Sequence, residues 1–197
     1  RTMEFWLSVQ TTGERESMRG RFRDIEELTA AVAKWDLDFV QLDAGSAPTD
    51  LTQTRAPGLL IQRFRFGAAC LQRGASPLGM RTYGLRESEA RGARMFGSDL
   101  SGTDLTQFQA GGDFEGVSQS DFACLSVSID ETLFEEALEA VNLYRVDGLS
   151  ETGPRVLSVA PKLVGRVRCR AKQLLDVLEA NPSALARSVF VEDQAFE

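Results

Sequence analysis

The sequence predicts a mostly β fold, a closed barrel or a sandwich, with helices flanking it. Between about residues 38 and 129, short runs of alternating side chains are separated at close intervals by glycine, proline and polar residues. Before and after this region, apolar residues recur every three or four positions, as they do in helices. The chain has 197 residues, 43% of them hydrophobic, which suits one globular domain with a sizeable core.

The first element is a predicted helix over residues 23–37. Asp24, followed three positions later by Glu27, is a capping pattern for a helix N-terminus. Four apolar residues fall on one helical face, expected to pack on the barrel: Ile25, Leu28, Val32 and Trp35. Residues 1–21 are interpreted as an N-terminal extension, with a tag remnant before Met3.

A strand over residues 38–45 and a hairpin over residues 51–67 follow. Proline and glycine at positions 57 and 58 suit the consecutive centre positions of a tight turn. In the second hairpin strand, alternation separates two faces. The expected interior face carries Leu60, Gln62, Phe64 and Phe66, and the opposite face carries Leu59, Ile61, Arg63 and Arg65.

Further strands are expected at residues 79–85, 104–109, 112–118 and 122–129, with a surface loop at 86–94. The period then changes. Asp130 is the expected cap of a helix over residues 131–142, and a loop follows at 145–155. A last long helix begins near Pro161 and is closed by Asn181-Pro182. Its apolar stripe is the expected dimerisation surface: Leu163, Val167, Leu174 and Leu178.

The composition excludes several kinds of chemistry. The chain has no histidine, which excludes Ser-His-Asp and Cys-His pairs and His-ligated metal sites. No tight cluster of carboxylates or thiols is visible, so neither a metal nor another cofactor is expected. Three widely spaced cysteines without a CxxC pair indicate a reduced cytoplasmic compartment. No apolar run approaches the ~20 residues that span a bilayer, so no membrane partner is expected.

The charge distribution is uneven. The net charge is −7, yet Arg155–Lys172 contains six basic residues and no acidic residue. The plainer interpretation is a solvated helix face. The alternative is a surface turned towards an acidic partner or nearby DNA.

One motif resembles the second conserved motif of the cupin superfamily. Five residues stand at the positions of its Gly, Pro, Gly, His and Asn: Thr103 (beside Gly102), Gln109, Gly111, Phe114 and Ser118. Only Gly111 is identical, and Phe114 replaces the histidine that follows the turn in metal-binding barrels. Because the first cupin motif with its paired histidines is absent, the resemblance implies a barrel without metal chemistry.

Longer runs resemble the N-terminal domain of AraC/XylS-type transcription regulators. These runs are residues 22–45, 72–85 and 105–129, and residues 168–197 are similar to the linker helices that follow that domain. The resemblance implies a cupin-like jelly-roll barrel at 22–150 that senses an effector, and linker and dimerisation helices at 151–197. It also implies a homodimer that contacts DNA only through a helix-turn-helix domain absent from these residues.

The expected function is therefore regulatory and not enzymatic. Two alternatives stay open. The first is a metal-free cupin isomerase or epimerase, with Tyr83 or a glutamate as general base. The second is a cupin domain that binds a protein partner, which would show an exposed apolar patch in place of a cavity.

Strand alternation gives the candidate residues of a binding pocket. The candidates for effector binding are Gln41, Gln62, Phe64, Phe66, Tyr83, Phe108 and Phe122, with Thr82 beside them. The phenylalanines equally suit a plain core, the glutamines a solvated strand face, and Tyr83 a support for a helix. Arg63 and Arg65 suit either an exposed face or a clamp for an anionic effector. Cys70 and Cys124 suit small buried positions, with redox sensing as the alternative.

Overall fold

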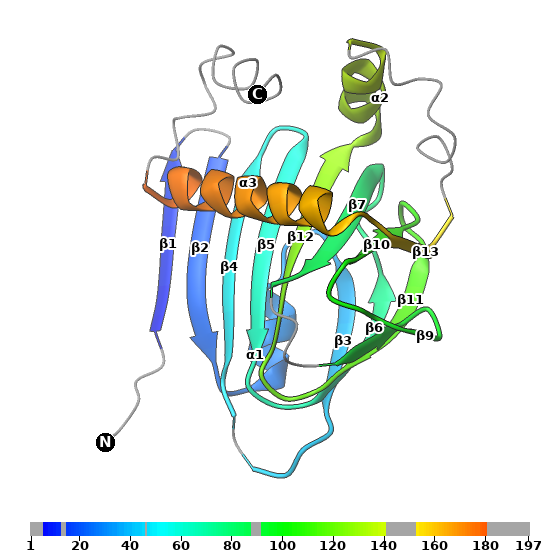
Figure 1. Ribbon diagram of the computed structural model, residues 1–197. Helices are drawn as coiled ribbons and strands as arrows, with labels where there is room; N and C mark the ends of the chain where they lie inside the picture. Colours follow the sequence, from blue (N-terminus) through cyan, green and yellow to red (C-terminus); the bar gives the residue numbers. More distant parts are fainter. Residues whose placement is uncertain (1–5, 13–14, 46, 88–91, 141–152, 181–197) are drawn as a thin grey trace.

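The computed structural model describes residues 6–12, 15–45, 47–87, 92–140 and 153–180 (Figure 1). Two antiparallel sheets face each other. The larger has eight strands, in the order β1 (Trp6–Thr12), β2 (Arg15–Phe22), β4 (Thr49–Ala56), β5 (Leu59–Phe66), β12 (Phe122–Asp130), β7 (Met80–Arg86), β10 (Asp104–Phe108) and β13 (Arg155–Ser158). The smaller has five, in the order β3 (Asp36–Gln41), β6 (Cys70–Ala75), β11 (Asp113–Ser118), β8 (Ala93–Met95) and β9 (Ser98–Asp99).

This architecture confirms the predicted fold class, a mostly β fold with flanking helices. Strands distant in sequence become neighbours, since β12 lies between β5 and β7. The predicted hairpin joins β4 and β5, with Gly58 in the left-handed region (φ 70°) that such a turn requires.

The alternation in β5 is confirmed. Leu60, Gln62, Phe64 and Phe66 are all buried on the inner face. The β12 side chains opposite them in register are Ser128, Ser126, Cys124 and Phe122, as the period-2 pattern predicts. The main core cluster lies between the sheets and includes the Phe39, Phe64 and Phe66 rings.

The first helix is shorter than predicted. α1 covers Ile25–Ala31, and Asp24 caps it as expected by accepting from the Glu26 and Glu27 backbone N–H groups. Trp35 therefore does not belong to the helical stripe. The side chain of Gln53 bonds the Ala31 carbonyl and the Ala33 N–H, and Lys34 takes a left-handed conformation (φ 63°). These hydrogen bonds with Gln53 and the turn at Lys34 end the helix, and Trp35 points inward.

Six strands lie where none was predicted: β1, β2, β6, β8, β9 and β13. Residues treated as an N-terminal extension form β1 and β2, and β2 pairs with β4 along its length. β13 lies at the end of a segment expected to be a loop, and it pairs with β10.

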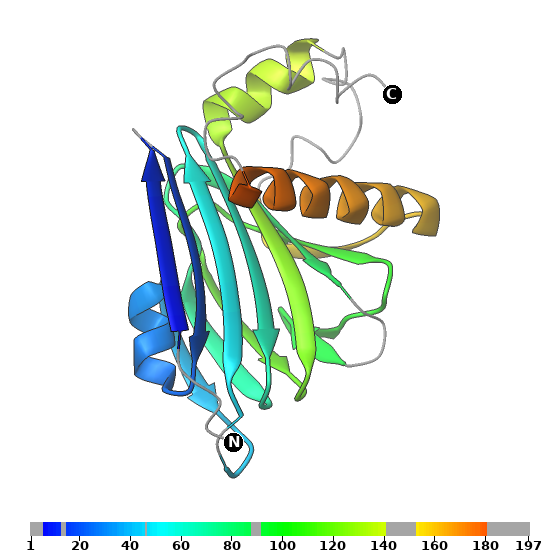
Figure 2. The ribbon, with the colours of Figure 1, turned by 90° about the vertical axis from the view of Figure 1, so that its left-hand side faces the viewer.

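Two further helices flank the larger sheet. α2 (Glu131–Ala140) begins at the predicted cap, Asp130, which accepts from two backbone N–H groups of the first turn. Residues 141 and 142, the last two of the predicted helix, lie outside the described residues. α3 (Pro161–Ala180) crosses the outer face of the larger sheet, and Figure 2 shows α1 and α3 on opposite sides of that sheet. None of the described helices is long and apolar enough to cross a membrane.

Candidate ligand-binding cavity

A cavity lies between the two sheets. It is lined by inward-facing residues of both sheets and by Trp35, from the connection between α1 and β3. The volume open to the centre of a water molecule is about 60 Å³. The inner-face alternation of β5, β7, β10 and β12 builds most of its wall, because these strands are neighbours in the larger sheet.

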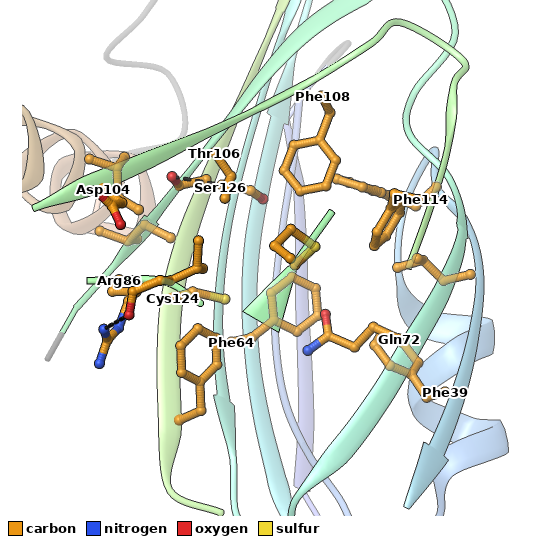
Figure 3. Close-up of a pocket in the computed structure, with 18 residues that line it drawn as sticks. Phe39, Phe64, Gln72, Arg86, Asp104, Thr106, Phe108, Phe114, Cys124 and Ser126 are labelled. Carbon is orange, nitrogen blue, oxygen red and sulfur yellow. Dashed lines mark hydrogen bonds between the residues drawn. The ribbon is translucent and has the colours of Figure 1, made fainter. Parts of the chain in front are cut away.

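Aromatic rings form one wall of the cavity. Trp35, Phe108 and Phe114 contact one another edge-to-face, with centroids 5.2 Å (Trp35–Phe108), 5.5 Å (Trp35–Phe114) and 5.0 Å (Phe108–Phe114) apart. Phe64 and Met95 add further apolar surface. In Figure 3 the Phe108 and Phe114 rings lie on one side of the group, and Arg86 and Asp104 lie on the other.

Phe114 is the residue at the histidine position of the motif that residues 103–118 resemble. Its ring, at the motif's histidine position, is buried in the aromatic cluster and lines the cavity. Within the described part of the chain, no three His, Cys, Asp or Glu residues are grouped so that they could hold a metal ion. The Phe114 ring thus packs in the core at the position where the motif has a metal-ligating histidine.

The opposite side of the cavity is polar and buried. Asp104 accepts hydrogen bonds from the Ser101 N–H (2.7 Å) and the Ser158 hydroxyl (2.8 Å). Burial alone would raise the pKa of Asp104, but these hydrogen bonds and the charge of Arg86 lower it below its ordinary value. Arg86 Nη1 donates to the Leu100 carbonyl at 2.7 Å. Asp104 is therefore ionised near neutral pH, and its contacts tie β10 to β13.

A network of buried amide groups lies behind the aromatic wall. Gln62, fully buried, accepts from Trp35 Nε1 at 2.7 Å and from the Ser126 hydroxyl at 3.3 Å. Its own amide N–H groups reach Gln53 Oε1 (3.0 Å) and the Ala33 carbonyl (3.5 Å). The network therefore connects a cavity side chain, Ser126, to the segment that follows α1.

The two inner-face thiols stay protonated. Burial raises the pKa of Cys124, which lines the cavity, to about 12, and the nearby carboxylate of Glu87 adds to the rise. Burial likewise raises the pKa of Cys70 to about 11. Because the thiolate is the reactive form, neither group is set up for redox chemistry at neutral pH.

The structure brings together only some of the predicted site residues. Phe64, Phe108 and Phe122 line the cavity. Gln62 reaches it through Ser126. As ligand contacts, all of these stay predictions.

The other candidates lie elsewhere. Phe66 and Gln41 border a second, smaller hollow beside α1, where Gln41 bonds the Asp43 and Gly45 carbonyls. Thr82 is buried and donates to the Ser128 hydroxyl at 2.8 Å. Tyr83 lies on the outer face of the larger sheet, opposite Val127 in register and 6.0 Å from the Phe134 ring of α2. Tyr83 thus supports a helix, one of its three expected roles.

The outer-face arginines of β5 also lie away from the cavity. Arg63 forms an ion pair with Glu87 at 2.8 Å, and Arg65 is exposed. The sequence analysis did not single out the cavity residues Arg86, Asp104 and Gln72. Alternation with Phe108 in its strand could have identified Asp104.

The predicted dimerisation stripe is divided by the fold. Leu163 and Val167 are 50% and 41% exposed. Leu174 packs partly against the cluster that joins Ala171 and Leu175 of α3 to the sheet. Leu178 belongs to α3, but its side chain lies outside the described part.

Neither a protein-family model nor a curated protein sequence matches this chain. Among solved structures, the AraC-like transcriptional activator CuxR is similar with a TM-score of 0.57 at 14% sequence identity, over 89% of this chain and 62% of that one. Vicilin from Corylus avellana gives a TM-score of 0.27 at 6% identity, over 76% and 52% of the two chains. Oxalate decarboxylase from Bacillus subtilis gives 0.24 at 10%, over 78% and 40%. The CuxR match supports the fold, and this chain spans about 62% of the CuxR length.

Proposed function

We propose that this chain is the sensing and dimerisation domain of an AraC-type transcription regulator. The observation that carries the proposal is the likeness of its fold to the AraC-like activator CuxR over 89% of the chain. The cavity between the sheets adds the element that a sensor needs, a mostly apolar hollow with a few polar groups at its edge. DNA contacts belong to a further domain of the natural protein.

The ionisable groups of the cavity favour sensing over catalysis. A general base works best with a pKa near the operating pH. The pKa of Asp104 lies below its ordinary value and that of Cys124 is about 12. Tyr83, the base considered for an isomerase, lies on the outer face of the larger sheet.

Dimerisation through α3 is the second part of the proposal. Leu163 and Val167 present apolar surface to solvent, while Ala171 and Leu175 on another side of the helix bind it to the sheet. A two-fold dimer would cover the exposed residues and match paired DNA half-sites. The basic residues of the helix would then lie at the flanks, where salt screens them over about 8 Å.

Chromatin immunoprecipitation of the natural full-length protein, epitope-tagged in its own cells, tests the function. The proposal expects enrichment at discrete promoters and a gene that continues past codon 197 into two helix-turn-helix units. A gene that stops soon after this codon, or a protein that enriches no DNA, would contradict the proposal.

A further inference from the structure

We propose that the cavity binds a small, uncharged, mostly apolar molecule that carries one hydroxyl or N–H group, and that this group donates a hydrogen bond to Ser126. The inference rests on the proposed function, because it names the chemical class of the effector for the same cavity. Four features of the cavity support it. They are the apolar surface of the wall, the partners that the charged groups already have, the acceptor capacity of Ser126 and the volume.

The surface that a ligand would contact is largely apolar. Trp35, Phe64, Phe108, Phe114 and Met95 supply most of it. Cys124 adds a protonated thiol, which behaves as a small apolar group. Such a wall attracts hydrocarbon and offers little to replace the hydration shell of an ion.

The two charged groups at the cavity edge already form hydrogen bonds within the chain. Asp104 accepts from Ser101 and Ser158, and Arg86 donates to the Leu100 carbonyl. Arg86 also acts electrostatically on the ionised Asp104. A charged ligand would therefore compete with one of these groups for its counter-charge, whereas a neutral ligand leaves both arrangements intact.

Ser126 offers a place for one donor. It is buried, and its hydroxyl donates to Gln62 Oε1 at 3.3 Å. A hydroxyl has one hydrogen and two acceptor positions, so the Ser126 oxygen keeps acceptor capacity. The amide N–H groups of Gln62 already bond Gln53 and Ala33. At this point of the wall, a ligand can therefore still donate a hydrogen bond to the Ser126 oxygen.

The volume limits the size of the ligand. About 60 Å³ is less than half of the roughly 150 Å³ cavity that holds benzene. A ligand of a few non-hydrogen atoms fits, with more space if the flexible Met95 moves. Gly84, Thr106 and Phe108 all line the cavity, and a Cβ at Gly84 would lie 2.4 Å from Thr106 Oγ1 and 3.4 Å from Phe108 Cε2, so that an added methyl group would displace these side chains of the wall.

Four probes of equal size test the chemical class. 2-Propanol is neutral with a donor, acetone is neutral without one, acetate is an anion and isopropylammonium is a cation. Each probe is titrated into the 197-residue chain carrying Trp6→Phe. Binding is monitored through the NMR signal of the indole N–H. Trp35 is then the single tryptophan, and its N–H lies in the network with Gln62 and Ser126.

We expect a saturable shift with 2-propanol, at a dissociation constant in the millimolar range or somewhat below, as suits so few atoms. Acetone should bind at least threefold more weakly, and the two ions should cause no saturable shift. Ser126→Ala should remove the preference for 2-propanol over acetone. Gly84→Ala should weaken 2-propanol at least fivefold, whereas Gly165→Ala should change nothing, because no atom lies within 4 Å of a Cβ there.

A second variant guards against misfolding of Gly84→Ala. In Gly116→Ala, the added Cβ would lie 2.6 Å from Met95 Cε and Sδ and would displace this side chain of the cavity wall. Tighter binding of either ion than of 2-propanol, or binding unchanged in both glycine variants, would overturn the inference. Absence of binding by all four probes would also overturn it, while DNA enrichment in cells would still support the proposed function.

Discussion

Gln62 shows how far a single position can be predicted. Strand alternation places its side chain in the interior, and the structure confirms full burial. Its partners could not be predicted, because Trp35 and Ser126 lie 27 and 64 positions away in sequence. Trp35 itself was assigned to a helical face, since the pattern does not reveal that Gln53 ends the helix early.

Replacing Gln62 with leucine should destabilise the chain strongly. The variant keeps the volume but leaves the Trp35 N–H and the Ser126 hydroxyl without their buried acceptor. Each such group costs about 1–3 kcal/mol, so the free energy of unfolding should fall by roughly 2–6 kcal/mol. Urea unfolding measures this, with Gln109→Leu at an exposed position as the control. A loss below about 1 kcal/mol would show that the network contributes little.

The cysteines should differ in reactivity. Cys169 is exposed, whereas burial raises the pKa of Cys70 to about 11 and of Cys124 to about 12. Iodoacetamide at pH 7.5 should therefore label Cys169 rapidly and the other two only after unfolding. Mass spectrometry of timed samples gives the order. Labelling of Cys124 as fast as that of Cys169 would disagree with its burial.

At the scale of elements, the helix starts were predicted correctly, because they depend on residues close in sequence. Asp24 and Asp130 cap their helices, and α3 begins at Pro161 as predicted. Six strands were not predicted: β1, β2, β6, β8, β9 and β13. β2 and β13 pair with β4 and β10, which are distant in sequence, whereas β1 pairs with its neighbour β2. The apolar stripe of α3 was found, but the sequence could not tell which of its residues face the sheet.

Two variants of α3 should separate attachment of the helix to the sheet from dimerisation. Leu175, 1% exposed, packs with Ile61 and Leu125 of the sheet, so Leu175→Asp should lower the free energy of unfolding by about 2–4 kcal/mol. Leu163→Asp with Val167→Asp should leave stability nearly unchanged but convert a dimer to a monomer. Sedimentation equilibrium and urea unfolding measure the two effects. A folded double variant that stays dimeric would place the interface elsewhere.

Asp104 should stabilise the β10–β13 pair in a pH-dependent way. Its pKa is lowered in the folded chain, so its contribution is present at neutral pH and is lost as the pH falls through the folded value. Asp104→Asn should cost about 1–2 kcal/mol at pH 7. In acid the difference between variant and parent should shrink. A difference that stays constant from pH 7 into acid would contradict the assigned role.

At the scale of the whole molecule, composition predicted more about chemistry than about shape. The absence of histidine led to an expectation of no metal, and the structure places the Phe114 ring in a core cluster with Met95 and Phe108. The cavity was foreseen as one of two possible interiors. Phe64, Phe108 and Phe122 of its wall were among the candidates, but Trp35, Arg86 and Asp104 were not, because only the order of the strands brings them to one cavity.

Elemental analysis should find no transition metal in the purified chain. The expectation follows from the lack of histidine and of clustered thiols, since these are the preferred ligands of such metals. Protein prepared without chelator should contain well under one equivalent of iron, manganese, nickel or zinc. A stoichiometric amount of any of them would contradict the metal-free assignment.

The central claim is that the occupied cavity controls transcription, and one measurement addresses it directly. Transcripts are compared between cells whose natural gene carries Gly84→Ala, cells carrying Gly165→Ala, a deletion strain and the parent. We predict that Gly84→Ala changes the same transcripts as the deletion, because the added methyl group displaces the Thr106 and Phe108 side chains of the cavity wall, whereas Gly165→Ala matches the parent. A stable Gly84→Ala protein with the parental transcripts, in a background where deletion changes them, would contradict control by the cavity. A deletion without effect on any transcript would contradict a regulatory function.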